Sequence, residues 1–330
     1  MVAAGPPRAR SHPRRAIVGA VEAECTIGVD VGGTKIDVGV VERDGTIVRS
    51  ERRPTPVEST EALLTGLAAA VESVRDETVA AVGIGIPSTI DQRAGTAVFS
   101  VNIPLAGIDV RGWATETFGL PAAIDNDANC AALAEWRAGA GRGTTDMVMI
   151  TLGTGIGGGL ILGGRLYRGW IGAGAELGHM VVDGGGAPCQ GHCTGLGHLE
   201  GLSSGRAVDA AAERLLGAGS GTPELVAAAR GGDERALDAI ESAGRWLGVG
   251  IASIVNLLNP ELVVIGGGFG EAFDLLIGPA REVLARDGVV PARDVVRIVP
   301  AELGSDAGLI GAALVGFEAL DAAGVPAAHS

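Results

Sequence analysis

The fold of this chain is decided by the stretch Ile27-Gly28-Val29-Asp30-Val31-Gly32-Gly33-Thr34, in which an apolar strand runs into a glycine turn. Apolar residues resume over residues 36–41, so the stretch predicts two strands joined by a tight hairpin. The pattern returns as Met149-Ile150-Thr151-Leu152-Gly153-Thr154-Gly155, again with glycines and a hydroxyl in the turn. We therefore predict duplicated α/β lobes, each opened by such a hairpin, that face each other across a cleft.

Helical and strand-like segments alternate along the rest of the chain. We predict further strands over residues 79–86, 122–125, 147–152 and 261–265, and helices over residues 59–74, 112–118, 128–138, 242–258, 271–286 and 308–320. Residues 1–24 are rich in proline and arginine and are expected to be a solvated tail. A glycine-rich hinge at residues 139–143 would separate a first lobe over 25–142 from a second over 143–330, whose last helix can pack back on the first lobe.

The composition argues against several classes of partner. The chain of 330 residues holds 25 Lys and Arg against 39 Asp and Glu, and the net charge of −14 opposes binding to nucleic acid or to an anionic membrane surface. No apolar run is long enough to span a bilayer, and residues 1–24 lack the apolar stretch of a signal peptide. Four unevenly spaced cysteines do not form a disulfide framework in a chain of this length. We expect a cytoplasmic protein.

Both glycine turns are candidate phosphate sites. In Asp30-Val31-Gly32-Gly33-Thr34-Lys35, backbone N–H groups can approach phosphate oxygens and Asp30 can hold the hydration shell of Mg²⁺, although a turn without a ligand would also favour glycine. Residues 153–158 match the G-x-G-x-x-G pattern of NAD-binding domains. A dinucleotide site needs a helix to begin near the third glycine, whereas residues 160–162 predict a second strand. We therefore favour a phosphate turn over a dehydrogenase.

Asp127 is a candidate catalytic base. It follows the predicted strand over residues 122–125 and stands at the start of the next predicted helix, beside Asn126. The carboxyl end of a strand is a natural place for a catalytic side chain. Asn and Asp are also preferred helix caps, so the pair Asn126-Asp127 could serve only to start the helix.

Residues 176–200 form a candidate metal site, because three of the five histidines and two of the four cysteines gather there among glycines. Cys189 and Cys193, with His179 upstream and His198 downstream, would supply four tetrahedral ligands to a structural Zn²⁺. His192 is an alternative to His198 as the fourth ligand. A glycine-rich loop with two free thiols is the interpretation without a metal.

Taken together, these motifs resemble those of the ROK family of sugar kinases and related repressors, over nearly all of the chain from residue 25 onward. Asp30-Val31-Gly32-Gly33-Thr34-Lys35 is similar to the first phosphate motif of the family, residues 152–158 to the second, and residues 125–129 to the catalytic segment. Glu176-Leu177-Gly178-His179 and Leu199-Glu200 flank the zinc loop of the family.

The resemblance implies a two-lobed, actin-like or ribonuclease H-like ATPase fold and the ATP-dependent phosphorylation of a hexose, with glucose as the first choice. It implies Asp127 as the general base. The sugar hydroxyls would be held by Asn102, Asn126, Asp127, Glu176, His179 and Glu200. ATP and Mg²⁺ would be held by Asp30, Gly32, Gly33, Thr34, Lys35, Gly153, Thr154 and Gly155, with Gly266, Gly267 and Gly268 against adenosine. Such parts are sufficient, because phosphoryl transfer needs mainly positioning and charge neutralisation.

Several alternatives stay open at the level of the sequence. Kinases for N-acetylmannosamine, fructose or mannose resemble one another in these motifs, and polyphosphate could replace ATP. Repressors of the family add an N-terminal DNA-binding segment, for which residues 1–24 are too short and too rich in proline, and a non-catalytic sugar sensor is a further rival. We expect a homodimer that binds a hexose and ATP, with no nucleic-acid or membrane partner.

Two positions depart from the family pattern. The usual Cys-x-Cys-x4-Cys loop is here Cys189-x3-Cys193-x4-His198, which leaves the choice between His198 and His192 open. Ala175 stands where glycine commonly precedes the sugar-binding Glu, and we expect this change to matter little.

Overall fold

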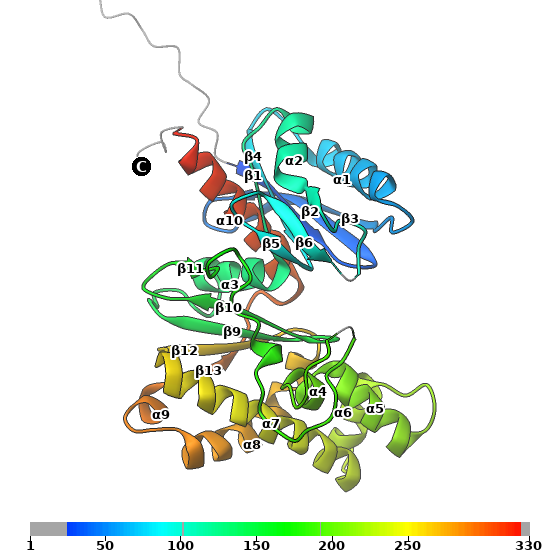
Figure 1. Cartoon of the computed structure of the whole chain (residues 1–330), viewed down its shortest axis with the longest axis vertical. Coiled ribbons are helices and arrows are strands. Elements are labelled where there is room, and N and C mark those ends of the chain that lie inside the picture. Colours follow the sequence, from blue (N-terminus) through cyan, green and yellow to red (C-terminus); the bar gives the residue numbers. More distant parts are fainter. Residues whose placement is uncertain (1–24, 101, 192, 325–330) are drawn as a thin grey trace, which may run out of the picture.

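A computed structural model describes residues 25–324 except 101 and 192, so the predicted tail lies outside the described residues. Two five-stranded sheets organise this part of the chain (Figure 1). The first has the strand order β3-β2-β1-β4-β8 and is formed by β1 (Cys25–Val31), β2 (Lys35–Glu42), β3 (Ile47–Pro54), β4 (Val79–Ile86) and β8 (Ala122–Asn126). The second has the order β11-β10-β9-β12-β13 and is formed by β9 (Met147–Leu152), β10 (Ile156–Ile161), β11 (Leu166–Tyr167), β12 (Leu262–Gly266) and β13 (Arg297–Pro300).

The two sheets share one topology. β1 and β2 form an antiparallel hairpin, β4 pairs parallel with β1, and β8 pairs parallel with β4. β9 and β10 form the equivalent hairpin, with β12 parallel to β9 and β13 parallel to β12. The repetition seen in the sequence is therefore a repetition of strand order. Because β10 follows the second glycine turn where a dinucleotide site would need a helix, the choice against a dehydrogenase agrees with the structure.

Helices cover both sheets. The first sheet packs with α1 (Thr60–Val74) and α2 (Val110–Phe118), and a small sheet of β5 (Ser88–Asp91), β6 (Thr96–Ser100) and β7 (Ile108–Asp109) adjoins it. Beside the second sheet lie α4 (Glu200–Ser203), α5 (Gly205–Leu216), α6 (Thr222–Arg230), α7 (Glu234–Leu258), α8 (Phe273–Asp287) and α9 (Ala292–Val295). Short 3₁₀ turns occur at η1 (Leu177–His179), η2 (Phe269–Ala272) and η3 (Gly304–Asp306).

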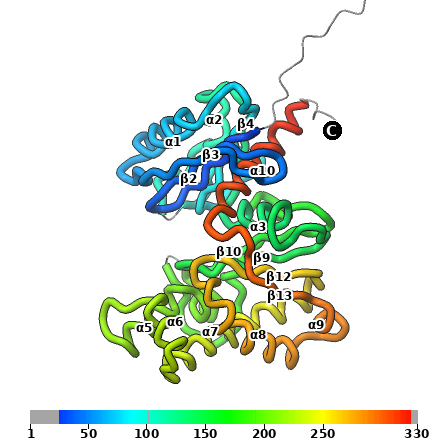
Figure 2. Tube along the Cα trace, turned by 180° about the vertical axis from the view of Figure 1, so that it is seen from behind, coloured from blue at the N-terminus to red at the C-terminus, as the bar shows by residue number. Residues whose placement is uncertain are grey.

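The last helix, α10 (Ala307–Ala322), returns to the first sheet and packs on β1 and β4, with α3 (Asp127–Ala138) beside it (Figure 2). Glycines in the strands permit this close approach. A Cβ at Gly83 would lie 1.8 Å from the carbonyl oxygen of Ala312, and one at Gly28 would lie 2.2 Å from that of Leu309. The Oγ1 of Thr26 donates a hydrogen bond to Ala313 at 2.8 Å. The abundance of glycine in this sequence thus serves helix–sheet packing as well as turns.

The second lobe has its own apolar core around α7. Ile240, Leu247 and Ile251 on this helix are buried with Val263 and Ile265 of β12. The helix ends as the sequence predicts, at Asn259, which adopts a left-handed conformation with a φ of 45° ahead of Pro260. Among the described residues, no helix is both long and apolar enough to cross a membrane.

Candidate active site

Asp127 is the first residue of α3, at the carboxyl end of β8. The cap of this helix is Asn126, whose Oδ1 accepts hydrogen bonds from the backbone N–H groups of Ala128 at 2.9 Å and Asn129 at 3.2 Å. The capping role left open by the sequence therefore belongs to Asn126. Asp127 accepts a hydrogen bond from the N–H of Ala128 at 2.9 Å and lines a cavity.

The segment before Asp127 is anchored by an ion pair that sequence reasoning missed. Asp125 is buried and accepts hydrogen bonds from the side chain of Asn129 at 2.9 Å and from Arg168 at 2.5 Å. Arg168 also donates to Glu318 on α10 at 2.6 Å. Arg168 comes from the loop after β11, where the sequence offers no signal beyond an arginine among glycines. It connects the second lobe with both the Asp127 segment and the last helix.

A central cavity of about 450 Å³ brings Asp30 and Asp127 together. Asp30 lies in β1 and Asp127 follows β8, and the parallel course β1-β4-β8 places these strand ends at one edge of the sheet. The glycine turn after β12 and the start of α10 complete the cavity, whose lining is Asp30, Asp127, Ala128, Ala131, Met149, Thr151, Ile265, Gly266, Gly267, Gly268, Gly270, Glu271, Phe273, Pro300, Ala301, Gly304, Ser305, Ala307 and Gly308.

The carboxyl groups of Asp30 and Asp127 in the central cavity have raised pKa values. Burial raises the pKa of Asp30 to about 7, with further increases from the nearby charges of Asp127 and Asp37 and a partial offset by Lys35. Burial also raises the pKa of Asp127, opposed by hydrogen bonds from the N–H of Ala128 and from Asn126. Two carboxylates that line one cavity and interact electrostatically create a site that favours a cation or a proton.

A second cavity of about 330 Å³, here called the loop cavity, contains three of the six predicted sugar ligands. Asn102, His179 and Glu200 line it together with Thr154 and Gly155 of the second glycine turn. The remaining lining residues are Phe99, Gln190, Gly191, Cys193 and Arg206. Three predicted sugar ligands and a candidate phosphate turn therefore share one cavity.

Glu200 is tied to the second glycine turn. Its Oε2 accepts a hydrogen bond from the N–H of Ile156 at 2.9 Å, and a Cβ at Gly155 would lie 2.3 Å from the same oxygen. A side chain at position 155 would therefore displace the carboxylate of Glu200 from this contact. Glu176 stands in electrostatic range of Glu200 and Asp127, and its pKa is raised chiefly by burial of the carboxyl group, with His179 opposing the shift.

A third cavity, the outer cavity, has a volume of about 830 Å³ and adjoins the other two. It shares Thr154 with the loop cavity, and Gly268 and Glu271 with the central cavity. Its other lining residues come mainly from α5, α6 and η2 and are Gly153, Gly205, Asp209, Thr222, Pro223, Val226, Ala227, Arg230, Phe269 and Ala272. The predicted turns at Gly153 and Gly268 therefore meet at one partly apolar space.

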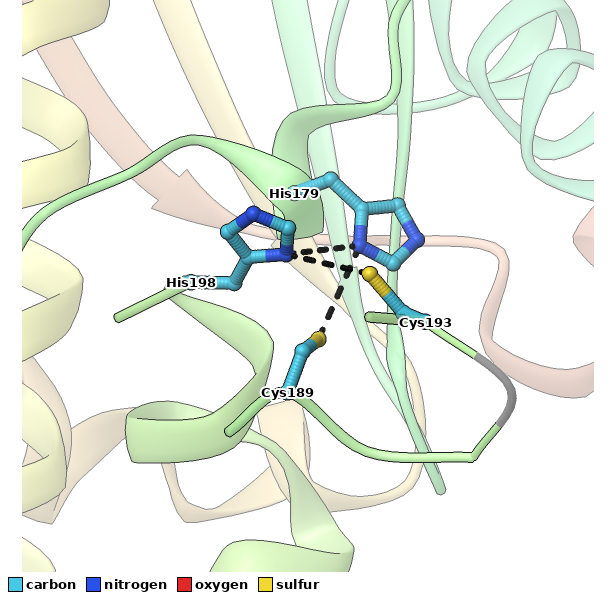
Figure 3. A group of neighbouring side chains, drawn as sticks. All are labelled: His179, Cys189, Cys193 and His198. Carbon is cyan, nitrogen blue, oxygen red and sulfur yellow. Dashed lines mark hydrogen bonds between the residues drawn. The ribbon is translucent and has the colours of Figure 1, made fainter. Parts of the chain in front are cut away.

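The four predicted metal ligands converge (Figure 3). The Nδ1 atoms of His179 and His198 lie 3.2 Å apart, the Sγ of Cys189 lies 3.7 Å from the Nδ1 of His179, and the Sγ of Cys193 lies 3.5 Å from the Nδ1 of His198. With Zn–N of about 2.0–2.1 Å and Zn–S of about 2.3 Å, ligand atoms around tetrahedral Zn²⁺ lie roughly 3.3–3.8 Å apart. The three distances are close to this range and all four ligand atoms lie within 4.8 Å of one another, so the side chains present are able to hold Zn²⁺. His192, the alternative ligand, lies outside the described residues.

Not every predicted residue reaches these cavities. Gly32, Gly33, Thr34 and Lys35 form an exposed turn that is absent from the lining of the central, loop and outer cavities. Lys35 forms an ion pair with Asp37 at 3.2 Å. A Cβ at Gly33 would lie 3.5 Å from the Cβ of Asn102, so the first turn still faces the loop cavity from the side of the first lobe.

Ala175 corrects one expectation. Its φ of 64° lies in the left-handed region, where an L-residue other than glycine pays about 1–2 kcal/mol. The change from the family's usual glycine therefore carries a backbone cost immediately before Glu176. The sequence alone gives no φ angle, so this cost is not visible in the motif itself.

Comparisons with known proteins relate this chain to one family. Residues 26–317 match the model of the ROK family. A glucokinase from Streptomyces coelicolor is 38% identical over 307 residues, covering 87% of this chain and 96% of the relative, and one from Thermotoga maritima is 37% identical over 311 residues, covering 88% and 96%. The solved ROK family glucokinase from Streptomyces griseus, in complex with glucose and AMPPNP, superposes with a TM-score of 0.77 at 36% identity, covering 89% of this chain and 99% of that one.

Proposed function

The chain belongs to the ROK family, and from this premise we propose that it is a sugar kinase that transfers the terminal phosphoryl group of ATP to a hydroxyl of glucose. The fold is the two-lobed, actin-like fold of its structural relatives. One observation carries the proposal. Asp127 lines the same cavity as the carboxylate of Asp30 and the glycine turn at residues 266–268, and a second cavity nearby contains the predicted sugar ligands.

Asp127 is proposed as the general base. In its ionised form it would accept the proton of the attacking sugar hydroxyl while that oxygen forms a bond to the γ-phosphorus and ADP leaves. Burial supports this role, because a raised pKa makes the carboxylate a stronger base than a solvated one. Asn126 and the Asp125–Arg168 ion pair hold the segment that carries it.

The loop cavity is the proposed sugar site. Asn102, His179 and Glu200 line it, and Glu176 lies in electrostatic range of His179 and Glu200. Asn126 is absent from the lining of this cavity, its Oδ1 caps α3 and its Nδ2 donates to the carbonyl oxygen of Ser88 at 3.4 Å, so its contact with the sugar is proposed only through the remaining N–H of Nδ2. Buried carboxylates that accept hydrogen bonds from hydroxyls discriminate strongly, since a sugar without the partner hydroxyl leaves a desolvated charge unpaired.

The donor is proposed to occupy the outer and central cavities. The outer cavity has room for a nucleoside and is partly apolar, and the turn at Gly267 approaches β9 so closely that a Cβ there would lie 2.4 Å from the carbonyl oxygen of Leu152. The turns around Gly33 and Gly155 would face the phosphates from the two lobes. Asp30, beside Asp127, suits Mg²⁺ or its hydration shell, and the cation would neutralise charge on the transferred group.

A structural Zn²⁺ held by His179, Cys189, Cys193 and His198 is part of the proposal. Its contribution would be to fix the loop between η1 and α4, which carries one side of the sugar site. With Nδ1 in the cluster, the Nε2 of His179 stays available for a sugar hydroxyl (Figure 3). We also propose that the protein is a cytoplasmic homodimer, because four unevenly spaced cysteines do not form a disulfide framework in a chain of this length.

The test is ADP release measured over a panel of hexoses with ATP or polyphosphate as donor. We expect ATP with glucose to give the highest kcat/KM, and ATP with N-acetylmannosamine, fructose or mannose to give less. Preferential use of polyphosphate would correct the donor. No sugar-dependent phosphoryl transfer with any pair would leave a sugar sensor as the better account.

A further inference from the structure

The loop cavity contains one cationic guanidinium that the proposed mechanism has not used. Arg206 is the second residue of α5, is exposed, and lines this cavity beside Thr154 and Gly155. Within the described part of the chain its side chain forms no ion pair and no hydrogen bond. It differs in this from Lys35, which pairs with Asp37, and from Arg168, which pairs with Asp125 and Glu318.

The backbone holds Arg206 against the second glycine turn. The N–H of Gly205 donates to the carbonyl oxygen of Gly153 at 2.8 Å, and the N–H of Arg206 donates to the carbonyl oxygen of Thr154 at 3.3 Å. A Cβ at position 205 would lie 2.6 Å from the oxygen of Gly153, so glycine is needed for this contact. Ser204 caps the helix by accepting a hydrogen bond from Ala207 at 3.2 Å. The start of α5 is therefore docked on the turn.

The charges around the three cavities suggest what Arg206 binds. Carboxylates at Asp30, Asp127 and Glu200 line the central and loop cavities and repel a phosphate chain. Among the residues that line the three cavities, the cationic side chains are Arg206 and Arg230, and Arg230 is already paired with Asp274 at 2.8 Å. Arg206 is thus the unpaired cationic side chain, among those that line the three cavities, that can bind a phosphate group next to the sugar site.

We propose that Arg206 binds the terminal phosphoryl group of the donor and orients it toward the sugar hydroxyl. A guanidinium can donate two parallel hydrogen bonds to phosphate oxygens, which fixes direction as well as charge. The contact would strengthen as negative charge spreads over the oxygens of the transferred group. This assignment rests on the proposed kinase function and adds to it a residue that binds and orients the terminal phosphoryl group of the donor.

The experiment compares Arg206→Gln and Arg206→Lys with Arg214→Gln as the matched control. Arg214 is an exposed arginine on the same helix, eight residues further along and hence about 12 Å away along the axis. We expect Arg206→Gln to lower kcat/KM for ATP by about 10- to 100-fold while the glucose KM changes less than about twofold. Arg206→Lys should recover part of the loss, and Arg214→Gln should behave as the wild type.

Binding supplies a readout that does not depend on turnover. Calorimetric titration without sugar should show that Arg206→Gln lowers the affinity for ATP more than the affinity for ADP, because ADP lacks the terminal phosphoryl group. Equal effects on the two nucleotides, a selective rise in the glucose KM, or wild-type kinetics would each overturn the assignment. If the wild-type protein itself phosphorylates no sugar, the proposed function fails. If the wild-type protein is active and the Arg206 variants behave like it, the proposed kinase function stands and the role of Arg206 is refuted.

Discussion

Replacing Asp30 by Asn should change how stability depends on pH, because the folded protein holds a proton on Asp30 more tightly than the unfolded chain does. The pKa of Asp30 rises from 3.8 to about 7, chiefly by burial and then by the charges of Asp127 and Asp37. Each pKa unit corresponds to about 1.36 kcal/mol, so the carboxylate costs the folded state up to about 4 kcal/mol once it is fully ionised.

The sign follows from the direction of this shift. A raised folded-state pKa gives stability that is fully present below about pH 4 and is lost as the pH rises through about 7. Asparagine does not titrate, so the variant avoids this loss. The advantage of Asp30→Asn over the wild type in the free energy of unfolding should therefore grow by about 2–3 kcal/mol between pH 5 and pH 8 in Mg²⁺-free buffer.

Urea unfolding followed by tryptophan fluorescence, at several pH values and with equal m-values required, measures this difference. Asp44→Asn is the control, because the pKa of Asp44 is lowered by hydrogen bonds to Thr46, so its effect should stay constant over the same range. Addition of Mg²⁺ should reduce the advantage of Asp30→Asn if the cation binds there. An advantage that does not vary with pH would refute the reasoning.

Three further predictions concern the loop and the sugar site. Protein purified without added metal should carry one Zn²⁺ per chain by metal analysis, and Cys189→Ser should lose both the metal and thermal stability; a metal content near zero with an unchanged Tm would exclude the site. Glu176→Ala and His179→Ala should each raise the glucose KM by at least about tenfold with little change in the ATP KM, whereas equal losses for both substrates would indicate mere loop support. Ala175→Gly should raise the free energy of unfolding by about 1 kcal/mol in chemical denaturation, because it relieves a φ of 64°; a destabilised variant would show that the strain is absent.

Much of the strand framework could be predicted from local sequence signals. A glycine turn predicted the hairpin at Gly32 and Gly33, and an apolar run predicted the strand at residues 79–86. The Asn-Pro pair predicted the end of the helix at Asn259. The small sheet β5-β6-β7 was not predicted, since its strands are short and pair with neighbours whose register no local pattern gives. Helices α5 and α6 were also not predicted; both are short and rich in alanine, and the glycines at positions 217, 219 and 221 interrupt the chain between them.

The sequence allowed several candidate residues to be grouped, but it did not give the contacts that hold them. The convergence of Cys189, Cys193, His179 and His198 follows from their spacing, although the sequence could not choose between His198 and His192. The anchoring of Asp125 by Arg168 depends on contact between segments 43 residues apart. Such pairs lie beyond any argument from periodicity, because only the packed fold brings the two lobes together.

The most direct test of the account is the kinetics of Asp127→Asn beside direct binding of glucose and ATP. A general base acts in the transition state, so removing its charge should lower kcat by a factor on the order of 10²–10⁴ while both substrates bind with nearly wild-type affinity. Wild-type protein must form ADP in strict dependence on glucose in the same assay. A variant that keeps a near-normal kcat and shows only a raised KM would contradict the assignment of Asp127 as the base.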